Sequence, residues 1–185
     1  MQQSFPVFII VTVVALSLAA AISDGLTGRI PNWLTVPGVL LGIVCHGWAG
    51  GSTALGLSVL GVFVTALVPT VFYQASSGRA IGGGDVKLAA AIGALSGPMQ
   101  GLEIEFAALL SLAFLALLRL SYTGQLGRVL GNVCHLVTNP IRPKAQRKAI
   151  APESLTELRM GPGIALGVLV VLLGEHLERL LPWLA

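Results

Sequence analysis

Long apolar segments, nearly free of charge, constrain the fold of this chain more than any other feature. Six such segments can be separated, each long enough to cross or nearly cross a lipid bilayer: residues 5–23, 33–49, 53–73, 86–101, 103–120 and 161–176. A helix over the first would cover roughly 28 Å, close to the thickness of about 30 Å of a hydrocarbon core. We therefore expect an all-α polytopic membrane protein, a bundle of six transmembrane helices forming a single domain over residues 1–185.

The amino-acid composition agrees with this class and removes several others. Hydrophobic residues make up 55% of the chain and charged residues 10%, whereas a soluble domain carries about 25% charged residues. No stripe of basic and aromatic side chains is present, so we expect no nucleic-acid partner. Cys45 and Cys134 lack a CxxC spacing and are expected toward opposite membrane faces, which argues against a disulfide or a zinc site. The three histidines are scattered, and we expect no metal and no cofactor.

The basic residues predict the orientation in the membrane. If the N-terminus is outside, every lysine and arginine except Arg179 falls in or beside the loops that face the cytoplasm. Cytoplasmic loops are enriched in basic residues, so we predict an inner-membrane protein with both termini outside. Glu103 and Glu105 then lie on the outer side, where we expect them to cap the fifth helix.

The long cytoplasmic loop, residues 121–158, is expected to contain a further helix that does not span the membrane. Apolar residues recur there with the spacing of one helical face: Leu126, Val129, Leu130, Val133, Cys134 and Val137. This stripe is too short to cross a bilayer, and we predict an amphipathic helix on the inner membrane surface. The basic run from Arg142 to Lys148 suits anionic lipid headgroups, with a strip that docks the substrate as the alternative.

The chain contains only two aspartates, and each stands at the end of an apolar segment. Ionisable residues beside hydrocarbon are rare and generally serve a function. Asp24 belongs to the run SDGLTGRIPN, in which we expect Gly25 to end the first helix and Asn32 to cap the second. In the simpler alternative, Asp24 is a solvated acid in a well-formed turn.

The second aspartate, Asp85, follows three glycines in the run AIGGGDVKLAAAIGA, at the expected start of the fourth helix. Gly82, Gly83 and Gly84 leave an open backbone, which we predict an extended substrate chain approaches closely. Asp85 alternatively caps its helix, a role compatible with a chemical one. Lys87 is predicted either to contact the substrate or to extend its ammonium group toward the membrane surface.

Both aspartates are expected at the cytoplasmic face, where packed helices about 8–10 Å apart permit their carboxyl groups to meet. Two adjacent carboxyl groups share a proton, so the ionised one can activate water while the protonated one polarises a carbonyl. From the helix dipoles we predict that Asp85 is the more often ionised member and Asp24 the protonated one. This arrangement predicts an aspartic peptidase. The alternatives are a small proton-coupled transporter and a non-catalytic subunit of a secretion or pilus assembly.

Taken together, the runs SDGLTGRIPN and GGGDVKLAAAIG resemble the type IV prepilin peptidases, a family of membrane aspartic proteases with a GxGD motif. Gly82, Gly84 and Asp85 match that motif, and Asp24 matches the family's first aspartate. The run GPGIALG, residues 161–167, is similar to the family's last-helix signature, although a methionine precedes it where the family commonly has phenylalanine.

The resemblance implies an endopeptidase that removes a short basic leader from a prepilin or pseudopilin at the cytoplasmic face. The cut would follow a glycine that precedes the hydrophobic helix of the substrate. Longer relatives carry an insert with paired CxxC motifs, linked to methylation of the trimmed pilin. Nothing similar occurs here, so the resemblance is to the short form that serves tight-adherence pili or archaeal preflagellins. The expected partners are the substrate, membrane lipids and components of a pilus or secretion assembly.

Overall fold

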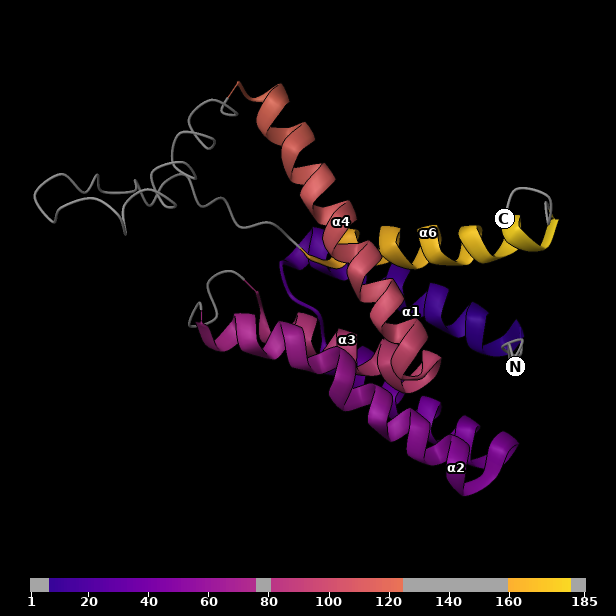
Figure 1. Cartoon of the computed structure of the whole chain (residues 1–185). Coiled ribbons are helices and arrows are strands. Elements are labelled where there is room, and N and C mark those ends of the chain that lie inside the picture. The colour runs from indigo at the N-terminus through magenta and orange to yellow at the C-terminus, as the bar shows by residue number, and fades with distance from the viewer. Residues whose placement is uncertain (1–6, 76–80, 125–159, 181–185) are drawn as a thin grey trace, which may run out of the picture. The chain divides into compact units, whose positions relative to one another are not determined.

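The structure, a computed structural model, describes residues 7–75, 81–124 and 160–180. These residues form helices and no strands: α1 (Val7–Thr27), α2 (Asn32–Ala75), α3 (Gly83–Ser96), α4 (Pro98–Tyr122) and α6 (Met160–Leu180) (Figure 1). The prediction of an all-α chain is confirmed for this part of the molecule. The predicted interfacial helix, Cys134 and the run from Arg142 to Lys148 lie outside the described residues.

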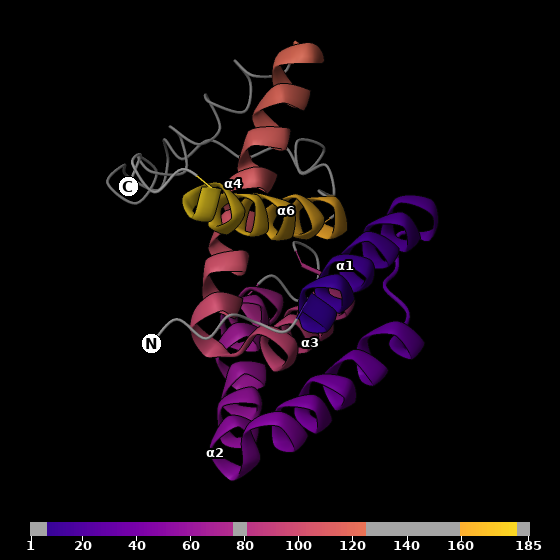
Figure 2. The same cartoon turned by 90° about the vertical axis from the view of Figure 1, so that its right-hand side faces the viewer.

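α2 consists of two helical halves that meet at Gly51, whose backbone is not helical (φ 67°, ψ −157°). Glycine adopts a positive φ readily because it has no Cβ atom. Figure 2 shows the resulting bend between the two halves. The break falls between the expected segments 33–49 and 53–73.

The boundary between α3 and α4 differs from the expected one. The sequence predicts apolar helices over 86–101 and 103–120, but the chain breaks at Gly97, inside the first of these ranges. Gly97 has a φ of 79°, and its N–H donates to the carbonyl oxygen of Gly93 at 2.8 Å. Pro98 then begins α4. A glycine after one helix and a proline at the first position of the next separate two helices even where both flanks are apolar.

α3 is buried over most of its length and packs against α1 and α2. Gly61 of α2 lies directly against the backbone of Gly93, so neither position has room for a larger side chain. The hydroxyl of Thr65 donates to the carbonyl oxygen of Ala89 at 2.8 Å, a hydrogen bond from α2 to α3. Close contacts between glycines and hydroxyl bonds between helices are typical of packing in lipid. These contacts fix the position of α3, which carries Asp85 in its first turn.

α6 packs against α1 and α4. Its first turn contacts the end of α1, as described for the site below. Gly163 and Gly167 face α4, where a Cβ atom at either position would meet Leu112 or Ala108. The small residues of the GPGIALG run therefore let α6 approach two neighbours closely.

Within the described ranges, three helices are long and apolar enough to cross a membrane by length and composition: Val7–Thr27, Asn32–Gln74 and Pro98–Tyr122. α6 adds a shorter apolar stretch, Gly161–Leu172. Large apolar side chains are exposed on the outside of these helices, among them Val11, Trp48 and Phe63. A surface of this kind is compatible with a membrane protein.

The chain divides into two compact units, Met1–Leu112 with Arg159–Ala185, and Ala113–Leu158. In the second unit the structure describes the end of α4 and a turn that closes at Gly124, which has a φ of 67°. All the residues of the candidate site described next belong to the first unit.

Candidate active site

Asp24 lies in the last turn of α1 and is buried, with 7% of its surface exposed. The alternative of a solvated loop acid is therefore wrong. Its Oδ2 atom accepts a hydrogen bond of 3.1 Å from the backbone N–H of Gly161, in the first turn of α6. An N–H group at the start of a helix is a favourable partner for a carboxylate.

The turn after Asp24 differs from the predicted one. The sequence predicts that Gly25 ends the helix, but α1 continues to Thr27 and the residue with a positive φ (67°) is Gly28. The hydroxyl groups of Ser23 and Thr27 both donate to the carbonyl oxygen of Arg29, at 3.0 and 3.2 Å. These bonds stabilise the chain reversal at Gly28 instead of at Gly25. Asp24 therefore lies inside the helix and not in a loop.

Gly161 is a site residue that the sequence analysis did not single out. A Cβ atom there would lie 2.8 Å from Cβ and 3.0 Å from Oδ2 of Asp24, and 3.2 Å from Cα of Ala21. The position therefore has space only for glycine. The resemblance of the run 161–167 to a family signature was the available signal, but it did not indicate which residue the run contacts.

Asp85 is the third residue of α3 and is buried, with 9% of its surface exposed. Its Oδ2 atom accepts a hydrogen bond of 3.0 Å from the N–H of Gly82, and its own N–H donates to the carbonyl oxygen of Gly82 at 3.1 Å. Asp85 therefore helps to cap α3, but from the third position of the helix back to Gly82, and not as the residue that precedes the helix. The glycine run therefore positions the carboxyl group as well as opening the backbone.

Burial raises the pKa of Asp85 to about 6, with a smaller upward contribution from the negative charge of Asp24. The hydrogen bond from Gly82 acts in the opposite direction because it stabilises the carboxylate. Gly84, next to Asp85, lies against Ile30 in the turn that follows α1, so the fold brings together the two helix ends that carry the acids, 61 residues apart in sequence. Desolvation acts against the helix dipole, the effect from which the sequence predicts Asp85 to be the more readily ionised member.

The three glycines before Asp85 have different surroundings. A Cβ atom on Gly84 would lie 3.0 Å from Cβ and 3.3 Å from N of Ile30, in the turn between α1 and α2. At Gly83 the nearest atom would be Cε2 of Tyr73, at 3.9 Å, and Gly82 is exposed. Gly84 therefore packs against the turn that follows Asp24, and Gly83 has room for an approaching chain. A Cβ atom on Gly82 would lie 3.3 Å from Oδ2 of Asp85, so that glycine leaves the carboxyl group accessible.

Lys87 is exposed, and its Nζ atom donates to Oδ1 of Asn32 at 2.8 Å. This bond ties the start of α3 to the start of α2. The sequence predicts that Asn32 caps α2, but Asn32 is the first residue of that helix. Its amide oxygen accepts the hydrogen bond from Lys87. The carbonyl oxygen of Pro31 instead accepts the first bond of α2, from the N–H of Leu34 at 3.1 Å.

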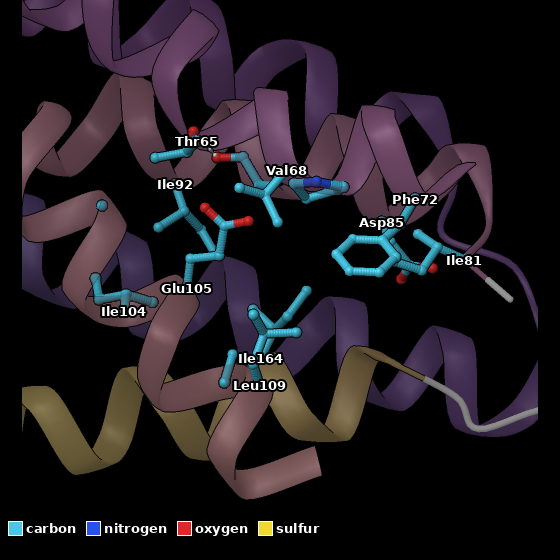
Figure 3. Close-up of a pocket in the computed structure, with 14 residues that line it drawn as sticks. Thr65, Val68, Phe72, Ile81, Asp85, Ile92, Ile104, Glu105, Leu109 and Ile164 are labelled. Atoms are coloured by element: carbon cyan, nitrogen blue, oxygen red, sulfur yellow. Dashed lines mark hydrogen bonds between the residues drawn. The ribbon is translucent and has the colours of Figure 1, made fainter. Parts of the chain in front are cut away.

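A narrow pocket, open to solvent at its mouth, extends from Asp85 between α2, α3 and α4. Most of its lining is apolar, and Figure 3 shows Asp85 and Glu105 at separate places along it. The prediction that Glu105 caps a helix on the outer side is wrong, because α4 begins at Pro98 and Glu105 lies well inside it. Its side chain lines the pocket instead.

The described residues contain no group of three or more His, Cys, Asp or Glu side chains that could hold a metal ion. Searches of curated proteins and of solved structures find no match. The model of one protein family, described as the type IV leader peptidase family, matches residues 10–118, a range that contains both Asp24 and Asp85. Because this match covers more than half of the chain, the protein belongs to the type IV leader peptidase family.

Proposed function

We propose that this protein is a membrane-embedded aspartic endopeptidase in which Asp24 and Asp85 form the catalytic pair. The observation that carries the proposal is that both acids are buried at helix ends that pack together, with Gly84 against Ile30, in a chain of a leader peptidase family. Both acids are buried at helix ends, where a substrate chain can reach them from the glycine run. Two carboxyl groups in such proximity share one proton more readily than they both ionise.

The raised pKa of Asp85 supports a division of roles within the pair. Asp85 holds the shared proton and donates a hydrogen bond to the carbonyl oxygen of the scissile peptide. Asp24, which accepts the N–H of Gly161, removes a proton from the attacking water. This assignment reverses the one predicted from the helix dipoles. The resulting hydroxide attacks the carbonyl carbon. The proton taken up by Asp24 then passes to the amide nitrogen as the C–N bond breaks, and no covalent intermediate with the enzyme forms.

The proposed substrate is a prepilin-like protein with a short basic leader, cut at the cytoplasmic face before its hydrophobic helix. The proposed topology has six spans and places both termini outside. α2 supplies two of these spans, one before and one after Gly51. Gly82 and Gly83 are the proposed point of approach for the substrate backbone, since Gly82 is exposed and a Cβ atom at Gly83 would have room. Lys87, two residues after Asp85 and exposed, is a further proposed contact of the substrate, and a pilus or secretion assembly is the proposed setting.

The proposal is tested by co-expressing the full chain with a candidate prepilin and following leader removal by a shift in electrophoretic mobility. Asp24→Asn and Asp85→Asn are nearly isosteric, and each is expected to lower the cleavage rate by roughly 10²–10⁴-fold because acid–base chemistry is lost. Glu103→Gln is the matched control, since Glu103 is an exposed acid outside the site. If both aspartate variants cleave at the rate of the control, the proposed function is wrong.

A further inference from the structure

Glu105 is the one described acidic residue, apart from Asp85, that lines the pocket. Both oxygens of its carboxyl group are shielded from solvent, and neither has a hydrogen-bond partner among the described residues. Figure 3 shows this carboxyl group directed into the space between α2, α3 and α4, with Val68 and Ile92 around it. A buried acceptor without a partner is costly to the free protein, and a ligand that donates to it would remove that cost.

The rest of the lining narrows the chemistry of that ligand. The hydroxyl of Thr65 is already engaged by the carbonyl oxygens of Gly61 and Ala89, at 2.9 and 2.8 Å. The other residues that line the pocket with Glu105 are mainly apolar. The pocket therefore fits a group that is apolar along its length and presents a hydrogen-bond donor where it meets Glu105. A lipid acyl chain lacks such a donor and would leave the carboxyl group unpaired.

We infer that this pocket is the binding site for the apolar segment that follows the scissile bond of the substrate, with Glu105 as its hydrogen-bond acceptor. The inference rests on the proposed function, because the occupant is the substrate of that reaction. The pocket is continuous with Asp85, as a site next to the cleaved bond must be. The segment that follows the cut binds in an extended form in this narrow space, so its backbone N–H groups have no partner within the segment and supply the donor.

Steady-state cleavage of a prepilin by the purified full chain tests the role of Glu105. Glu105→Leu removes the acceptor and is expected to raise KM roughly tenfold while kcat changes less than about twofold. Glu105→Gln keeps one acceptor oxygen and is expected to have a smaller effect, about threefold in KM. Glu103→Leu and Glu103→Gln, two residues away on an exposed position, are the matched controls. Thermal unfolding of each variant separates binding from loss of structure.

Photo-crosslinking tests the occupant independently of the rate. A benzoyl-phenylalanine introduced at Phe72, which lines the pocket, is expected to crosslink the prepilin in its segment after the cleavage site. The same analogue at Phe63, an exposed position of α2 outside the pocket lining, is the control and is expected to crosslink lipid. Crosslinks from Phe72 to lipid alone, or an unchanged KM in Glu105→Leu, overturn the inference. Cleavage that survives Asp24→Asn and Asp85→Asn overturns the proposed function instead, so the two failures are distinguishable.

Discussion

The N–H of Gly161 donates a hydrogen bond of 3.1 Å to Oδ2 of Asp24, joining the first turn of α6 to the last turn of α1 across 137 residues of sequence. The contact is close enough that a single added carbon at position 161 would touch the acid. The bond orients one of the two carboxyl groups, and it depends on a residue outside the segment that the family model matches. The position of Asp24 is therefore determined by the packing of two distant helices.

Gly161→Ala is expected to disturb the site directly. The new Cβ atom would lie 2.8 Å from Cβ of Asp24, so α1 and α6 must separate, at a cost of about 1–3 kcal/mol in the free energy of unfolding. Prepilin cleavage should fall at least about tenfold, since the oriented carboxyl group moves. Gly174→Ala is the control in the same helix, because no atom lies within 4 Å of its added carbon. Equal cleavage by the two variants would contradict the role assigned to Gly161.

The titration of Asp85 predicts a dependence of stability on pH. Its pKa is raised from an ordinary value of 3.8 to about 6, so the folded chain binds this proton more tightly than the unfolded chain. The stability contributed by protonation is fully present below about pH 4 and is lost as the pH rises through about 6. Asp85→Asn should therefore be more stable than wild type at pH 7, by about 1–3 kcal/mol, and not at pH 4.

The measurement is thermal or chemical unfolding of both proteins in detergent between pH 4 and 8. Asp24→Asn provides a second check, because removal of the Asp24 charge should move the titration of Asp85 to lower pH. Parallel stability curves for wild type and Asp85→Asn would show that the carboxyl group is not buried as described.

Gly83→Ala and Gly84→Ala separate two roles within the glycine run. At Gly84 the added carbon would lie 3.0 Å from Cβ of Ile30, so we expect a loss of about 1–3 kcal/mol in stability together with slower cleavage. At Gly83 the nearest atom would be 3.9 Å away, so stability should be retained. A rise in KM for Gly83→Ala at unchanged stability would support close approach of the substrate. An unchanged KM would place the substrate elsewhere.

Lys87→Met and Asn32→Ala both remove the hydrogen bond between α3 and α2. The pair is exposed, so each substitution should cost less than about 1 kcal/mol in the free energy of unfolding. If the lysine also contacts the substrate, Lys87→Met should raise KM by several-fold more than Asn32→Ala does, and the double variant should match Lys87→Met. Equal effects of the two single variants would indicate that Lys87 has a purely structural role.

Some features of the site were readable because they depend on neighbouring residues alone. The capping of α3 by Asp85 follows from an acid three residues after a glycine at the start of a helix, and the structure contains that bond. Other local readings were wrong where two local signals compete. Gly25 and Gly28 could each end α1, and the side-chain bonds to Arg29 select the second.

The error at Glu105 has a similar cause. The apolar segment 86–101 continues past its interruption at Gly97-Pro98, so hydropathy predicts a start for the next helix at residue 103, five residues after α4 begins. A glutamate expected at a helix start is in fact within the helix and faces a pocket. Hydropathy averages over a window and does not register a single residue with a positive φ.

The sequence by itself determined the helical class, the apolar surface and the presence of an acid at each of two helix ends, because these follow from local composition and periodicity. The tertiary structure alone decided that Gly161 holds Asp24, that the charge of Asp24 acts on Asp85, and that Glu105 shares the pocket of Asp85. These relationships depend on which helix faces pack together. That choice is made by contacts between residues far apart in the chain, and no local pattern encodes it.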